Sequence, residues 1–302
     1  MAVRRYHRWH DLASRRVHSR VRASRAYHRH AAGPVGTCHV RELLVSDGAS
    51  AWQAAGFSVE RAESASPFVR VGEDFTIHLG CLQRSGAGRS HGKPRGIIGW
   101  GLRSLPLPVP GGAAAACDSD IDGIASYAVP GATAPATHAA PARRRALHPN
   151  CAIGVDHIVV RSDDWVRTDA ALSRHGFTLR RRRDDVYPGI TQLFYRSSSR
   201  CSDTSNDSNG NSNSNSAGPI VELVAPTTPS TKGKAAPAPT AFVWGVTFVV
   251  ADIAAAKNWL GDRAGDVRSA VQPGRHILVL RRRHAGVNSS VNIAFMTQHV
   301  KC

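Results

Sequence analysis

Two titratable side chains lie in the middle of short apolar segments, and no other residues of this sequence are better placed for chemistry. His157 lies in VDHIVV (155–160) and Glu222 lies in IVELV (220–224), each among β-branched neighbours that favour a strand. Burying an imidazole or a carboxylate in such surroundings is unfavourable unless a partner satisfies it. Because side chains alternate along a strand, His157 is expected to share a face with Val155. If the two strand faces line one hollow, the imidazole and the carboxylate converge there.

A converging imidazole and carboxylate permit two kinds of site. The pair suits a divalent Fe, Mn, Ni or Zn ion, and a catalytic metal centre needs about three protein ligands with an open position. Alternatively, His157 and Glu222 bond each other, or water, in a metal-free binding cleft. The residues themselves leave both alternatives open.

Three segments share the order strand, short helix, glycine, strand, and they predict the elements that position the pair. These segments are 39–60, 153–180 and 242–268, and later strands complete each of them. Aligned on their apolar cores, Glu42, His157 and Thr247 occupy equivalent positions. The sequence therefore predicts an α+β fold of repeated βαβββ modules.

The motifs of the second segment resemble a known family. VDHIVV, a helix that ends in HGF, TQLFYR and IVELVAP resemble the glyoxalase/bleomycin-resistance/dioxygenase group, the vicinal oxygen chelate superfamily. The resemblance implies paired modules that form a curved mixed sheet with outer helices. It also implies a divalent metal, with His157 as the first-strand ligand and Glu222 as the last-strand ligand. The partner module offers Thr247 where a second His is expected, and Ala294 or Phe295 where a second Glu is expected, so half of that ligand set is missing.

Further polar residues are candidates for contact with a bound substrate. Gln192 lies in the strand ITQLFYR, Thr247 lies in WGVTFVV, and Arg275 follows the Pro273–Gly274 turn, from which it could point at an anionic substrate. Glu42 is expected to be a solvated strand residue beside Arg41, although it could supply a carboxylate from the first module.

The chain divides into segments of different composition. Residues 1–30 contain nine arginines and one acid, Asp11, so 1–37 is either an organelle transit peptide or a disordered basic arm. Residues 38–105 form a truncated module, packed alongside the others or pairing with another chain, and 106–145, rich in Pro, Ala and Gly, form a flexible linker. Residues 146–300 form a paired glyoxalase-like domain, whose modules are 146–226 and 240–300. A Ser/Asn-rich disordered insert, 197–218, interrupts the first of them.

The net charge of +17 raises the question of nucleic-acid binding. No recognisable nucleic-acid motif accompanies the arginine runs 143–145, 180–183 and 281–283, which are typical of solvated faces and guarded sheet edges. No apolar run approaches the roughly 20 residues of a membrane span. We expect a soluble protein without a membrane partner, in the cytoplasm, or in mitochondria if residues 1–30 are a transit peptide.

The sequence supports three hypotheses for function. In the first, a glyoxalase-like protein binds or transforms a small molecule in a concave sheet cleft; as an enzyme it would be a metal-dependent lyase, isomerase or dioxygenase. In the second, a metal-free module sequesters its ligand, as bleomycin-resistance relatives do. In the third, the basic arm associates with nucleic acid. The resemblance also allows a homodimer.

Overall fold

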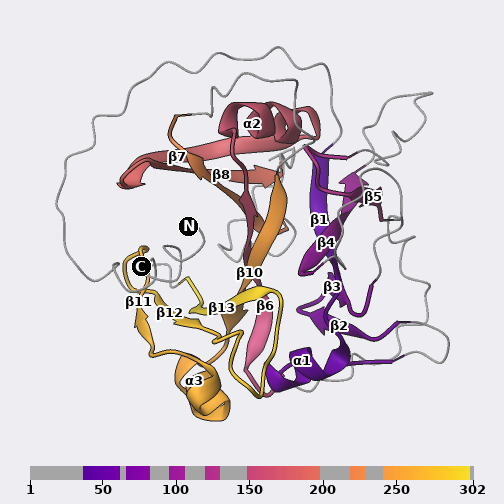
Figure 1. The fold of residues 1–302 in the computed structure, drawn as a ribbon, viewed down its shortest axis with the longest axis vertical. Coiled ribbons are helices and arrows are strands. Elements are labelled where there is room, and N and C mark those ends of the chain that lie inside the picture. The colour runs from indigo at the N-terminus through magenta and orange to yellow at the C-terminus, as the bar shows by residue number, and fades with distance from the viewer. Residues whose placement is uncertain are drawn as a thin grey trace, which may run out of the picture.

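The computed structural model of the chain describes residues 37–61, 66–81, 95–105, 120–129, 148–197, 218–228 and 241–299. The predicted basic arm and the Ser/Asn insert lie outside these ranges, apart from their end residues. The described chain forms two mixed β-sheets that lie against each other (Figure 1). None of its helices is long and apolar enough to cross a membrane.

The larger sheet contains two βαβββ modules, as predicted. The first module consists of β6 (Ala152–Arg161), α2 (Trp165–Arg174), β7 (Phe177–Tyr187), β8 (Ile190–Ser197) and β9 (Ile220–Pro226). The second consists of β10 (Phe242–Val250), α3 (Ile253–Leu260), the 3₁₀ turn η3 (Gly261–Arg263), β11 (Arg268–Ser269), β12 (His276–Val279) and β13 (Asn292–Thr297). The strand order is β11-β12-β13-β10-β6-β9-β8-β7. The antiparallel pair β6/β10 joins the modules, and each of these strands pairs in parallel with the last strand of its own module.

Local sequence explains where the module helices begin. The Asp164 carboxylate accepts hydrogen bonds from the Val166 and Arg167 amides at the start of α2, and Asp252 caps α3 in the same way. These bonds satisfy amides that have no partner within the helix. Gly176 has φ 81° immediately before β7, a left-handed conformation that glycine adopts readily.

The smaller sheet repeats the same arrangement with fewer strands. Its elements are β1 (Thr37–Val45), α1 (Ala49–Ala54), β2 (Phe68–Val71), β3 (Phe75–His78), β4 (Ile97–Leu105) and β5 (Ser126–Ala128), in the order β2-β3-β1-β4-β5. β1 and β4 form the antiparallel centre, and each has a parallel outer neighbour, β3 and β5. The segment 97–105, expected to finish the first module, therefore corresponds to β10 and begins a partial fourth module.

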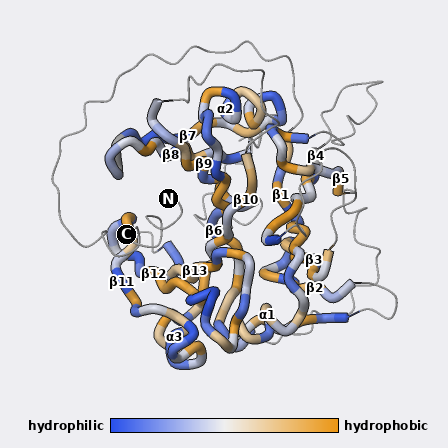
Figure 2. Tube along the Cα trace, in the orientation of Figure 1, coloured by the Kyte–Doolittle hydropathy of each residue, from blue (hydrophilic) through white to orange (hydrophobic). Residues whose placement is uncertain are grey.

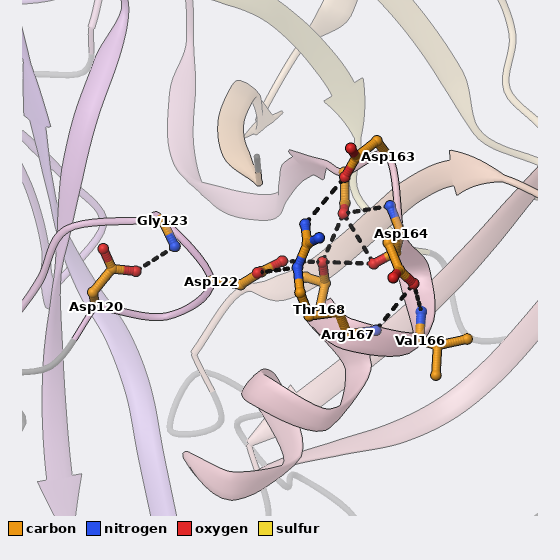
Figure 3. A network of polar contacts seen from close by, with 9 residues as sticks. Asp120, Asp122, Gly123, Asp163, Asp164, Val166, Arg167 and Thr168 are labelled. Atoms are coloured by element: carbon orange, nitrogen blue, oxygen red, sulfur yellow. Dashed lines mark hydrogen bonds and ion pairs between the residues drawn. The ribbon is translucent and has the colours of Figure 1, made fainter. Parts of the chain in front are cut away.

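The predicted flexible linker contains ordered structure, which corrects part of that interpretation. Its residues 120–129 include β5 and a turn whose Asp122 reaches α2 (Figure 3). The Asp122 carboxylate accepts hydrogen bonds from Arg167 Nε and Thr168 Oγ1, both at 2.5 Å. The Pro-, Ala- and Gly-rich composition of 106–145 therefore gave no indication that 120–129 are ordered and connect the smaller sheet to α2 of the larger one.

The two sheets share a core on the faces that carry the helices. Trp52 of α1 and Phe57 pack against Phe248 of β10, at ring centroid distances of 6.3 and 4.7 Å. Phe295 of β13 joins this cluster, and all four side chains are at most 2% exposed. Orange segments along β1, β10 and β13 mark these apolar strands (Figure 2). The smaller sheet thus packs alongside the larger one, one of the two arrangements expected for it, and leaves the opposite face of the larger sheet open.

Candidate functional site

The open face of the larger sheet forms a cleft of about 1250 Å³. Side chains from both modules line it, including His157 on β6, Glu222 on β9, Gln192 on β8 and Thr247 on β10. Alternate residues of the same strands, such as Phe248 beside Thr247, point into the shared core. Successive side chains of each strand thus point alternately into the core and into the cleft.

His157 lies at the centre of a connected polar group. Its Nδ1 lies 2.8 Å from Asp156 Oδ2, and its Nε2 lies 2.9 Å from Thr247 Oγ1 and 3.5 Å from Glu222 Oε2. The side chains of His157 and Glu222 are 14% and 12% exposed. The imidazole is thus bonded to one carboxylate on one side and faces a second carboxylate and the cleft on the other.

A bulge in β6 explains why Asp156, which the sequence reasoning missed, belongs to this group. In the pairing with β10, Thr247 lies opposite His157, but Phe248 lies opposite Val155, so Asp156 is an extra residue. A bulge interrupts the alternation of faces. Val155 consequently packs against the core, and the expectation that it shares a face with His157 is wrong. Strict alternation would have directed Asp156 away from the cleft, so only prediction of the bulge would have found it.

The last two residues predicted for the site, Gln192 and Arg275, donate hydrogen bonds to the carboxylates of Glu222 and Asp156. Gln192 Nε2 donates to Glu222 Oε1 at 2.9 Å. Arg275 Nη2 donates to Asp156 Oδ1 at 2.5 Å, and its Nε donates to the Thr297 carbonyl at 2.9 Å. Arg275 is only 5% exposed, so it braces Asp156 instead of pointing at a substrate from the rim. The five predicted residues are therefore brought together: Thr247 and Glu222 contact His157, Gln192 bonds Glu222, and Arg275 is joined to His157 through Asp156.

The charges of the group shift its pKa values. Burial by itself would raise the pKa of Asp156, but the bonds and charges of His157 and Arg275 outweigh it and lower this pKa to about 2. Burial likewise opposes a charge on His157, yet the bond from Asp156 and the charges of Glu222 and Asp156 raise its pKa above the usual value. Burial raises the pKa of Glu222 despite the charge of His157. The group therefore holds Asp156 ionised and favours a proton on the imidazole.

The donor atoms of the cleft fit a divalent ion only in part. Two ligands about 2.1 Å from a tetrahedral ion are about 3.4 Å apart, close to the 3.5 Å between His157 Nε2 and Glu222 Oε2. In the second module, Thr247 occupies the position equivalent to His157. Glu222 lies two residues beyond the β9 partner of His157, and Met296 lies two residues beyond Ala294, the β13 partner of Thr247. Met296 therefore corresponds to Glu222, which corrects the expectation of Ala294 or Phe295. Among the described residues, no three His, Cys, Asp or Glu side chains converge as a metal site. The described donor set does not complete a metal centre.

The smaller sheet carries the same residue pair in reversed order. Glu42 lies opposite Gly101, as His157 lies opposite Thr247, and His78 on the parallel neighbour corresponds to Glu222. Glu42 Oε2 accepts hydrogen bonds from His78 Nε2 at 3.2 Å and from the Tyr127 hydroxyl at 2.6 Å. Glu42 is therefore not the solvated residue that was expected.

Comparison with solved structures places this architecture among known folds. Neither the protein-family models nor the curated proteins that were searched give a match. A mutant of 4-hydroxymandelate synthase from Streptomyces coelicolor is 12% identical, with a TM-score of 0.50 over 87% of this chain and 93% of that one. A methylmalonyl-CoA epimerase from Mycobacterium tuberculosis is 16% identical, with a TM-score of 0.35 over 52% of this chain and 95% of that one. An epimerase variant from Streptomyces coelicolor, in complex with 2-nitronate-propionyl-CoA, is 18% identical, with a TM-score of 0.34 over 49% of this chain and 99% of that one.

The likeness to the synthase extends over both sheets and therefore concerns the whole described architecture. Together with the βαβββ modules and their parallel closing strands, it shows that the chain has the glyoxalase-like, vicinal oxygen chelate fold.

Proposed function

We propose that this protein binds a small molecule in the cleft of the larger sheet without a metal ion, and that His157 exchanges a proton with the bound molecule. The observation that supports this most directly is the position of the imidazole, whose Nδ1 is bonded to Asp156 and whose Nε2 faces the cleft. A carboxylate on Nδ1 holds the proton there and leaves Nε2 to accept or donate.

The electrostatics support this proton-handling role. The raised pKa of His157 favours the protonated imidazole, and a protonated imidazole suits a general acid. Glu222, whose pKa burial raises, can take up that proton across 3.5 Å. Thr247 and Gln192 lie at the same point of the cleft and offer a hydroxyl and an amide to an oxygen of the ligand.

A binding screen tests this proposal. We would measure thermal unfolding of the full chain with separate panels of 2-oxo acids, dicarboxylic acids, aromatic diols and coenzyme A thioesters, and then measure the Kd of any compound that stabilises it. For such a compound, His157→Gln should raise the Kd at least about tenfold, because a cleft bond to a partly buried charged group is lost.

The reversed pair of the smaller sheet provides matched controls. His78→Gln and Glu42→Gln remove the same functional groups from the other sheet, and both should leave the Kd within about twofold of the parent. Equal losses in His78→Gln and His157→Gln would contradict the assignment of the site. Elemental analysis completes the test, since about one metal ion per chain that is lost in His157→Gln and Glu222→Gln would favour the metal-dependent alternative.

A further inference from the structure

Three arginines of β7 line the cleft beside the His157 group, Arg180, Arg181 and Arg183, and the last two face it in regular register. In the pairing of β7 with β8, Arg183 lies opposite Gln192 and Arg181 lies opposite Phe194. Gln192 is the residue that bonds Glu222, and both arginines line the cleft. The charge of Arg183 reaches far enough to influence the pKa of Glu222. The arginines therefore form one wall of the same cleft.

A bulge selects which members of the run 180–183 face inward. β7 has an irregularity between Leu179, which packs against the core, and Arg181, so Arg180 is the extra residue. Arg182 then points to the helix side, where its guanidinium lies 4.1 Å from the Trp165 ring centroid and 2.7 Å from Asp184. The expectation that this run forms solvated faces therefore does not hold for Arg183, which is partly buried in the cleft, whereas Arg181 is exposed at the cleft wall.

The inward pair creates an excess of positive charge. Burial and the neighbouring charge of Arg181 lower the pKa of Arg183, which means that its charged form is disfavoured where it lies. Nine arginines but only three acids, Asp156, Glu222 and Asp266, are among the described residues that line the cleft. Asp156 already bonds Arg275. An anion bound at this wall would relieve the repulsion between the two guanidinium groups.

The floor of the opposite half of the cleft has a different character. Ile277 and Val279 of β12 and Ala294 and Met296 of β13 line it with apolar side chains, and four arginines also line this half: Arg268, Arg281, Arg282 and Arg283. His157 lies between the two halves, and three strand spacings, about 14 Å of sheet, separate its strand from β7. The cleft therefore suits an elongated ligand with a charged end at the β7 wall and an apolar part over the floor of β12 and β13.

We infer that the ligand of this cleft is a multiply charged anion, a phosphate ester or polycarboxylate, whose charged end binds Arg181 and Arg183. Its apolar part lies over β12 and β13, and the group between them meets His157. This inference deepens the proposed function and rests on the same cleft, but it depends on different residues.

Calorimetric titration with inorganic pyrophosphate, at constant ionic strength, tests the anion site in the full chain. Pyrophosphate should bind the parent saturably, and Arg183→Gln and Arg181→Gln should each raise its Kd at least about tenfold. Arg182→Gln is the matched control, because it removes the same charge from the same strand but from the helix side. Its Kd should stay within about twofold of the parent. Arg183→Lys, which keeps the charge, should give an intermediate Kd and serves if the glutamine variant fails to fold.

The outcomes separate this inference from the proposed function. Absence of saturable binding to the parent, or an equal loss in Arg182→Gln and Arg183→Gln, overturns the anion site. If an uncharged ligand then still binds in a manner that depends on His157, the proposed function stands alone. If pyrophosphate binding requires Arg183 while no compound responds to His157→Gln, the anion site stands and the proton-transfer role fails.

Discussion

The chemistry of the cleft depends on one residue that does not follow the alternation of its strand. His157 and Glu222 were recognisable from sequence because a titratable side chain among β-branched neighbours stands out. Asp156 did not stand out, since regular alternation directs it to the wrong face. The face on which a strand residue lies, and therefore its partners, can be predicted from sequence only where the bulges of that strand can be predicted too.

Asp156→Asn provides a residue-scale prediction about pH. The lowered pKa of Asp156 stabilises the fold above about pH 4, and this contribution disappears as the pH falls toward 2. The raised pKa of His157 contributes stability below about pH 6.5, which disappears as the pH rises through the folded-state value. Asp156→Asn should therefore destabilise the protein most between about pH 4 and 6.5.

Urea unfolding as a function of pH would measure this window, and NMR titration would follow His157 directly. The imidazole pKa should exceed 6.5 in the parent and fall in Asp156→Asn. Asp163→Asn removes an exposed ion pair with Arg167 and is the control. A pH-independent difference between parent and Asp156→Asn would argue against a charge interaction between Asp156 and His157.

At the scale of elements, the strand–helix–strand repeats were predictable, but the later strands were assigned incompletely. Apolar periodicity and glycine positions indicated three modules, and the larger sheet confirms two of them. The segment 97–105 was assigned to the wrong module because its pairing with β1 is non-local. The strand β5 lies in a segment whose composition is typical of a linker. The local sequence pattern can indicate that a segment is a strand, but it does not indicate which distant strand it pairs with.

The connection between β8 and β9 gives an element-scale prediction. Deleting residues 200–215 from the Ser/Asn-rich run shortens this connection about fourfold. Because a shorter loop costs less entropy to close, the deletion should raise the free energy of unfolding by about 1 kcal/mol. Chemical unfolding of the full chain measures the change. Deleting residues 5–20, a stretch of equal length from the basic arm, should have no comparable effect, and a loss of stability on deleting 200–215 would count against the predicted disordered insert.

At the scale of the whole molecule, the two sheets contact each other at two separate points. Phe57, in the loop between α1 and the smaller sheet's β2, packs on Phe248 and Phe295 of the larger sheet, and the Asp122 contacts with α2 connect the two parts at a second point. Sequence analysis could not choose between packing within the chain and pairing with another chain, because an apolar strand face does not specify its partner. The larger sheet alone would expose a wide aromatic surface to water.

Phe248→Ala tests this shared core. Removing a ring that contacts both sheets should lower the free energy of unfolding by about 3–5 kcal/mol. Phe242 lies on the same strand but is 49% exposed, so Phe242→Ala should cost less than about 1 kcal/mol. Tryptophan fluorescence and far-ultraviolet circular dichroism should report one coincident transition in the parent. Separate transitions would show that the sheets unfold independently.

The bulge at Arg180 has a consequence for how β7 tolerates a change in length. Arg180 is the residue between Leu179 and Arg181 that has no partner on β8, so deleting it would leave Leu179 opposite Tyr195 and Arg181 opposite Phe194 in regular alternation. Arg181 and Arg183 would therefore stay at the wall. A one-codon deletion at this point would remove one positive charge from the cleft without shifting the register of the strand, so evolution can alter the charge of the cleft here while the scaffold is kept.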